Sequence, residues 1–132
     1  MSEAQSVENA ERHVACAKRL VACLLAGDVD GVGEIYAQDV VTWRNLDGRE
    51  LVRKQVMKIV EFLATGVTDL RYEDLRIEPT ETGFVQQHTL CCLSSKGEAV
   101  TVPACIVARV EGGRITRIDE YMDSAAMAPL MG

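Results

Sequence analysis

The spacing of apolar residues changes from a helical period to an extended one near Val67, and this change constrains the fold more than any other sequence feature. Up to residue 26, apolar residues recur at alternating intervals of three and four, as on one face of an amphipathic helix, and Gly27 follows as a C-cap. From Val67 to Met122 the period is two, as in strands with one buried face. Helices first and long strands afterwards predict an α+β domain in which helices cover one face of a sheet.

Three helices and a short strand are expected before Val67. The first helix spans about residues 7–26, and Asp28 is a favourable N-cap for a short second helix that carries Val32, Ile35 and Tyr36. Residues 40–43 have β-type composition, and a turn at 46–48 separates them from a third helix over about residues 52–63. The cations near that helix are expected to form a solvated face: Arg49, Arg53, Lys54 and Lys58.

Four long antiparallel strands are expected over about residues 67–78, 84–93, 99–110 and 114–122, because turn-forming residues lie at 81–83, 96–98 and 111–113. With the short strand, this meander forms a strongly curved, mainly antiparallel sheet. Three N-terminal helices packed on such a sheet enclose a pocket, where function should be sought.

Length and composition predict a single domain over residues 1–132, because 48% hydrophobic residues suffice for one core. The net charge of −6 argues against nucleic acid as a partner. No apolar run reaches the roughly 20 residues that span a bilayer. The polar, acidic first dozen residues do not form a signal peptide, so a cytoplasmic protein is expected.

Neither a metal nor an organic cofactor is expected. The five cysteines have no CxxC spacing and no histidine near them in sequence, and they are expected to be free buried thiols. The chain also lacks a glycine-rich phosphate loop and acidic residues paired at a ligating spacing.

Two segments carry a resemblance to a known superfamily: residues 25–40, which include Leu25-Ala26-Gly27-Asp28, and residues 113–123, which include Ile118-Asp119-Glu120-Tyr121. With the order of elements, they resemble the nuclear transport factor 2-like superfamily, which includes ketosteroid isomerases, limonene epoxide hydrolases and SnoaL-type polyketide cyclases. The resemblance implies a cone-shaped roll, often a homodimer through the outer sheet face. It also implies an apolar pocket that takes a hydrophobic small molecule.

The two best-known chemistries of that superfamily are matched only in part. By the resemblance, the positions of the isomerase tyrosine, base and second acid hold Leu20, Arg44 and Cys105, so a close copy of that isomerase is disfavoured. The epoxide hydrolase pattern is answered by residues 43–45 and by Glu120, but residues 86–89 lack its Arg-x-Asp.

Alternation and the resemblance together select candidate site residues. His88 and Glu120 are the candidate acid/base pair, because both would be desolvated on pocket-facing strands and each could shift the proton affinity of the other toward neutrality. Asn45 is a candidate neutral donor, and Tyr36 and Trp43 are candidate aromatic walls. The other expected substrate-binding residues are Gln86, Leu90, Cys105, Val107, Ile118 and Met122.

Several interpretations stay open. The protein could be an isomerase, cyclase or epoxide-hydrolase-type enzyme, a non-catalytic binding protein for a hydrophobic ligand, or a dimeric interaction module with a vestigial pocket. His88 could be a structural residue, Trp43 a core residue and Asn45 part of a turn, and Glu120 could pair with Arg109 or Arg117. A common cavity lined by both His88 and Glu120 would favour the enzyme.

Overall fold

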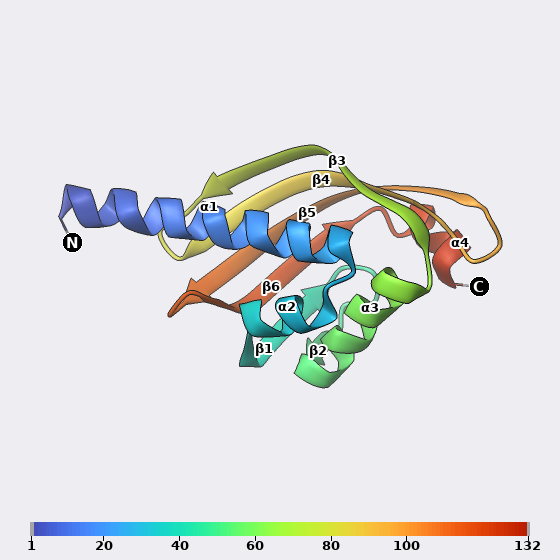
Figure 1. The fold of residues 1–132 in the computed structure, drawn as a ribbon, viewed down its shortest axis with the longest axis horizontal. Helices are drawn as coiled ribbons and strands as arrows, with labels where there is room; N and C mark the ends of the chain where they lie inside the picture. The colour runs from blue at the N-terminus through green and yellow to red at the C-terminus, as the bar shows by residue number, and fades with distance from the viewer. Residues whose placement is uncertain (1, 132) are drawn as a thin grey trace.

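The first helix lies across the concave side of a curved sheet in the computed structural model, which describes residues 2–131 (Figure 1). The elements in chain order are α1 (Glu3–Ala26), α2 (Val29–Ile35), β1 (Tyr36–Arg44), β2 (Glu50–Val52), α3 (Arg53–Thr65), β3 (Thr68–Pro79), β4 (Gly83–Leu93), β5 (Ala99–Glu111), β6 (Arg114–Met122), η1 (Ala125–Met127) and α4 (Ala128–Met131). The predicted α+β class is confirmed, because the three expected helices pack on one curved, unclosed sheet.

Helix α1 is delimited by caps at both ends. Ser2 and Gln5 form a capping box, so the helix begins at Glu3, earlier than the apolar period indicated. Gly27 ends it in the left-handed conformation with φ 68°, as the sequence predicted. The Asp28 side chain then accepts a 2.9 Å hydrogen bond from the Gly31 backbone N–H, which confirms the predicted N-cap of α2.

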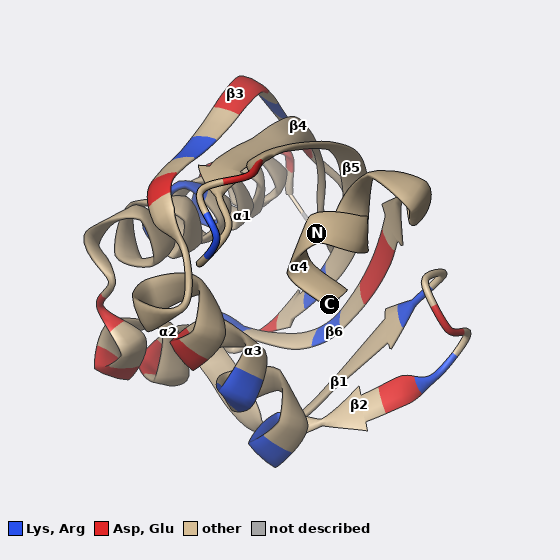
Figure 2. Cartoon of the chain, turned by 90° about the vertical axis from the view of Figure 1, so that its right-hand side faces the viewer, with Lys and Arg blue, Asp and Glu red and all other residues tan. Residues whose placement is uncertain are grey.

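The six strands are ordered β2-β1-β6-β5-β4-β3. Strands β3 to β6 form the predicted antiparallel meander, whereas β1 pairs with β6 in parallel and with β2 antiparallel. Viewed from the end, the sheet curves around the helices from β3 to β2 (Figure 2). Strand β2 was not predicted, because three residues are too few to establish a period.

Two predictions around α2 were wrong. Tyr36 was placed on the short helix, but the chain enters β1 at Tyr36 with no intervening loop. Arg53 was placed on a solvated face, but its guanidinium group donates hydrogen bonds to the carbonyl groups of Gly33 at 2.8 Å, Tyr36 at 2.9 Å and Ala37 at 3.3 Å. Arg53 therefore joins the start of α3 to the junction of α2 and β1.

Apolar side chains fill the space between helices and sheet in two clusters. The larger cluster joins α1, α2, α3 and the sheet, and it includes Leu20, Ile35 and Phe84. The smaller cluster includes Val100 and Val102, with the C-terminal elements η1 and α4 packed against it. These two C-terminal elements were not predicted from the sequence. Among residues 2–131, no helix combines the length and apolarity needed to cross a membrane.

Candidate functional site

Two adjoining hollows lie between the helices and the concave side of the sheet. The first, of about 80 Å³, lies between α1, α3 and strands β1, β3, β4, β5 and β6. The second, of about 100 Å³, lies toward the C-terminal elements. Each exceeds the roughly 10–15 Å³ needed by one water molecule. Both hollows share one wall, hereafter the shared wall, formed by Arg44, Ile59, Leu63, Tyr72, His88 and Glu120.

His88 occupies the shared wall as a neutral imidazole. The side chain is held by the Gln86 amide, whose Nε2 lies 3.1 Å from Nδ1 of His88, and by the Tyr72 ring, which stacks at a centroid distance of 4.5 Å. Burial lowers the pKa of His88 to about 4. With Nδ1 accepting from the amide, the proton resides on Nε2, which leaves His88 a hydrogen-bond donor at neutral pH.

Glu120 brings a carboxyl group into the same wall from β6. Burial raises the pKa of Glu120, and the positive charge of Arg44, its cross-strand neighbour, offsets part of the rise. Within residues 2–131, no side chain forms a hydrogen bond with this carboxyl group. Glu120 is therefore poised to exchange a proton. The alternative interpretation, a pair with Arg109 or Arg117, is not seen, and Arg117 instead contacts Glu50 and Asp119.

Two tyrosine hydroxyl groups lie near this carboxyl group. Tyr36 and Tyr72 both line the first hollow, and burial followed by the charge of Glu120 raises the pKa of each. Both hydroxyl groups therefore keep their protons at any physiological pH. Tyr36 was predicted as an aromatic wall, but Tyr72 was not predicted, because alternation on a largely exposed strand gave no signal of a pocket.

The first hollow is also lined by residues whose buried polar atoms have no hydrogen-bond partner. Among residues 2–131, Thr42 Oγ1, Arg44 Nε and Gln86 Oε1 are buried and have no hydrogen-bond partner. All three residues line this hollow, and Arg44 is anchored elsewhere by a 2.9 Å ion pair with Asp47. Unsatisfied buried polar atoms are uncommon in folded proteins, so these atoms mark a place where water or a polar ligand group would bind.

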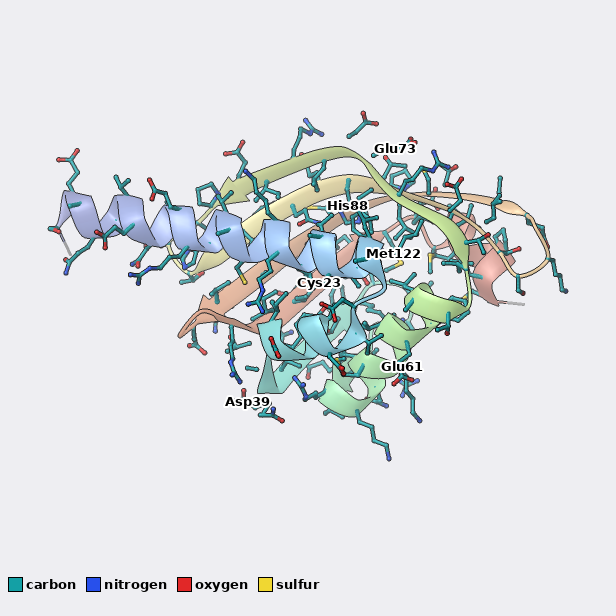
Figure 3. The ribbon with its side chains drawn as sticks, viewed as in Figure 1. Cys23, Asp39, Glu61, Glu73, His88 and Met122 are labelled. Carbon is teal, nitrogen blue, oxygen red and sulfur yellow. The ribbon has the colours of Figure 1, made fainter. Side chains whose placement is uncertain are left out.

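Most predicted site residues meet in these hollows. Tyr36, Gln86, His88, Ile118 and Glu120 line the first hollow, and Leu90 and Met122 line the second. Figure 3 shows His88 and Met122 between the strands and the helices, whereas Glu73 points away on the outer side of the sheet. The predicted mutual tuning was wrong, because burial dominates the shift of each group and moves the pKa of His88 away from neutrality.

On strand β1, the side chain that faces the hollows is the one next to the predicted site residues. Cross-strand partners share a face of the sheet, and Arg44 pairs with Glu120 while Trp43 pairs with Asp119. Arg44 therefore faces the hollows. The Trp43 ring instead contacts the Tyr121 ring, at a centroid distance of 5.2 Å. Asn45 does not line the hollows either. Its side-chain oxygen accepts a 2.9 Å hydrogen bond from the Met122 backbone N–H, and its side-chain amide donates a 3.1 Å hydrogen bond to the Met122 carbonyl group.

Strand β5 was also assigned to the wrong face. His88 pairs with Ala104, whereas Gln87 pairs with Cys105 and Val85 with Val107. Cys105 and Val107 therefore lie on the outer face, where Val107 is 41% exposed, and Ile106 takes their place in the first hollow. Within residues 2–131, no group of three or more histidine, cysteine or acidic side chains is arranged to hold a metal ion.

Comparisons with known proteins agree with this architecture. The SnoaL-like domain family matches residues 17–118, and the chain belongs to that family. No curated protein matches the chain significantly by sequence.

Solved structures share the fold at low sequence identity. An NTF2-like protein from Burkholderia xenovorans LB400 is 16% identical, with a TM-score of 0.74 over 90% of this chain and 95% of that one. A protein from Xanthomonas campestris, provisionally described as a polyketide cyclase, is 16% identical, with a TM-score of 0.76 over 87% and 93%. An LEH-like epoxide hydrolase from M. tuberculosis is 18% identical, with a TM-score of 0.73 over 92% and 91%. The nuclear transport factor 2-like fold is thereby confirmed.

Proposed function

We propose that this protein is an enzyme that performs acid/base chemistry on a neutral, largely apolar small molecule, with Glu120 as the group that exchanges the proton. The observation that carries the proposal is the unpaired carboxyl group of Glu120, whose pKa is raised by burial, in a wall that also holds hydrogen-bond donors. The carboxylate form of such a group is a stronger base than an exposed carboxylate, and it can accept a proton from carbon or from water.

The donors around Glu120 suit a substrate oxygen that gains negative charge during the reaction. Tyr36 and Tyr72 keep their hydroxyl protons, and the neutral His88 offers an N–H. One well-placed donor of this kind contributes about 3–4 kcal/mol to transition-state stabilisation. His88 is therefore assigned as a hydrogen-bond donor to the substrate, and Glu120 alone as the base or acid.

The chemistry is of a type that isomerases, cyclases and epoxide hydrolases have in common. Proton removal beside a carbonyl group gives an enolate, whose oxygen the tyrosine hydroxyl groups can stabilise. Activation of water by Glu120 serves epoxide opening, in which the hydroxyl groups donate hydrogen bonds to the leaving oxygen and that oxygen then takes the proton that Glu120 removed from water. The names of structural relatives, a polyketide cyclase and an LEH-like epoxide hydrolase, support this range of reactions.

The same proposal includes a homodimer in the cytoplasm. Trp43, Val107 and Tyr121 bring partly exposed apolar and aromatic surface to the outer face of the sheet, which suits contact with a second copy of the chain. Five free cysteines suit a reducing compartment.

Turnover of two substrate classes tests the proposal. The full chain is assayed with small cyclic enones, by their ultraviolet absorbance on double-bond migration, and with small alicyclic epoxides, by mass spectrometry of the diol. Glu120→Gln should lower kcat at least about 100-fold, whereas Glu111→Gln, which changes an exposed carboxyl group at the end of β5, should leave it unchanged.

Wild-type turnover by Glu120→Gln would overturn the acid/base assignment. Saturable binding of these compounds with no turnover of either class would favour the alternative function, a non-catalytic binding protein for a hydrophobic ligand, which requires the hollows but not a proton-exchanging group.

A further inference from the structure

The second hollow differs chemically from the first. Its polar lining residues are those of the shared wall, and its other lining side chains are apolar, among them Phe62, Leu90 and Val102. The unpaired buried atoms of Thr42 and Gln86, by contrast, belong to the first hollow alone. A molecule that occupies both hollows therefore meets hydrogen-bonding groups at one end and only apolar surface at the other.

The C-terminal elements form the far end of the second hollow. Met127 from η1 and Leu130 from α4 line it, and both pack against the smaller apolar cluster. Figure 2 shows α4 on the concave side of the sheet.

This end wall is attached to the sheet mainly through its first residues. The Asp123 backbone N–H donates to the Pro103 carbonyl at 3.2 Å, and the Asp123 carboxylate accepts from the backbone N–H groups of Ala125 at 3.1 Å and Ala126 at 3.4 Å. Further along, the contacts are the apolar ones of Met127 and Leu130, and the next residue, Met131, is 64% exposed. The position of Leu130 is thus fixed by packing, which a small-side-chain substitution can change without removing those hydrogen bonds.

We propose that the second hollow binds an aliphatic tail of the ligand, and that Met127 and Leu130 determine the tail length that the protein accepts. The proposal rests on the proposed function only for the polar end of the ligand, which lies at the shared wall. Each methylene group transferred from water into the hollow should tighten binding about fourfold. The increase should stop where the tail reaches Leu130, because a longer tail must displace α4.

Methionine methyl groups report directly on occupancy of this hollow. The full chain, labelled with ¹³C at the methionine methyl groups, is titrated with unbranched 2-alkanones from butanone to dodecanone, whose carbonyl oxygen can accept from Tyr72 or His88. The methyl signals of Met122 and Met127 should shift, with affinity that rises with chain length and then levels off. Met57 and Met131, which do not line the hollow, should keep their shifts.

Two substitutions should move the plateau in opposite directions. Leu130→Ala removes three carbon atoms from the end wall and should extend the plateau to longer alkanones, whereas Ala104→Leu fills the hollow and should shorten it. Met131→Ala, at the adjacent exposed position, is the matched control and should leave the plateau unchanged.

The proposal is overturned if the affinity does not depend on chain length, if the Met122 and Met127 signals do not move for any alkanone, or if the plateau is the same in Leu130→Ala and wild type. Glu120→Gln separates this proposal from the proposed function. If Glu120→Gln loses turnover but its alkanone affinity still depends on chain length, both proposals are supported. If the wild-type protein turns over substrate but its alkanone affinity does not depend on chain length, the tail site alone is overturned.

Discussion

Burial acts in opposite directions on the two titratable groups of the shared wall. The pKa of His88 falls to about 4, because a cation is disfavoured in the cavity, and the pKa of Glu120 rises, because an anion is disfavoured there. Burial therefore shifts each group toward its neutral form, which suits a pocket for a neutral ligand. It also makes each of them a measurable contributor to the pH dependence of stability.

His88 should make the protein less stable in mild acid. Its pKa is about 4 when folded and near 6.5 when unfolded, so the unfolded chain binds the proton first as the pH falls. The stability contributed by the neutral ring is complete above about pH 6.5 and is lost progressively toward pH 4, by about 3 kcal/mol in total. His88→Asn should remove this part of the pH dependence.

Glu120 contributes with the opposite sign, because its raised pKa makes the folded state take up a proton before the unfolded state does. The effect of His88→Asn is therefore measured in the Glu120→Gln variant. The free energies of unfolding of the single and double variants are compared by urea denaturation from pH 7.5 to pH 4.5. Equal slopes of unfolding free energy against pH, with and without His88, would contradict the assignment of a buried neutral imidazole.

Glu120→Gln alone should stabilise the protein above pH 7. A raised pKa means that the ionised carboxylate is less favourable in the folded state than in the unfolded chain, so the folded state loses stability once the pH exceeds that pKa. Removal of the charge should raise the free energy of unfolding by about 1 kcal/mol, as for other polar groups kept for function. Thermal denaturation at pH 8 measures the change, and exposed Glu111→Gln should show none. A lower melting temperature for Glu120→Gln would show that the carboxylate stabilises the fold.

The residues of the site were predictable only where a strand has one clearly apolar face. On β4 and β6 alternation placed Gln86, His88 and Glu120 correctly toward the helices. On β5 both faces carry apolar side chains, so composition could not decide between Val107 and its neighbour Ile106. A shift of one residue in phase reverses every side chain of a strand.

At the scale of elements, the helices and the meander followed from periodicity, but the connections between them did not. The apolar stripe of α3 identified which of its residues face the sheet, yet nothing in that stripe indicated that Arg53 would meet three carbonyl groups of the α2–β1 junction. The carbonyl groups at the end of a short helix need donors, and Arg53 supplies them from a distant part of the sequence. Such pairings depend on tertiary structure and carry no local signal.

Arg53→Ala should destabilise the protein by about 2 kcal/mol, since hydrogen bonds to charged groups contribute more than neutral ones. The loss arises because the carbonyl groups of Gly33 and Tyr36 lose a donor that water replaces only in part. Lys54→Ala, at the next and exposed position of the same helix, is the control and should change stability by less than about 0.5 kcal/mol. Urea denaturation monitored by circular dichroism measures both. A similar small effect for the two variants would show that Arg53 is not a structural link.

At the scale of the whole molecule, the change of period near Val67 determined the layers. Helices with one apolar stripe must cover a sheet face, and four strands joined by tight turns must form a meander, so the fold class followed from the sequence. The enclosed hollows depend on the curvature of the sheet and on the C-terminal elements η1 and α4. Those elements are too short to show a period, and the closure of the second hollow was therefore not predictable.

The two sides of the sheet should differ in association. The concave side is covered by helices, whereas the outer face leaves Val107 41% exposed and Tyr121 48% exposed. If this face joins two copies of the chain, Val107→Arg places an unpaired charge within the contact, which costs about 3–5 kcal/mol and should weaken dimerisation at least about 100-fold.

Sedimentation velocity at micromolar concentration should therefore give a dimer for the wild type and a monomer for Val107→Arg. The matched control is Val7→Arg, which makes the same substitution on α1, where Val7 is 54% exposed. This variant should remain dimeric. A wild-type chain that sediments as a monomer, or a Val107→Arg chain that still dimerises, would exclude the outer face as the contact. Because the hollows open on the concave side, Val107→Arg should also keep the binding of alkanones, which separates assembly from ligand recognition.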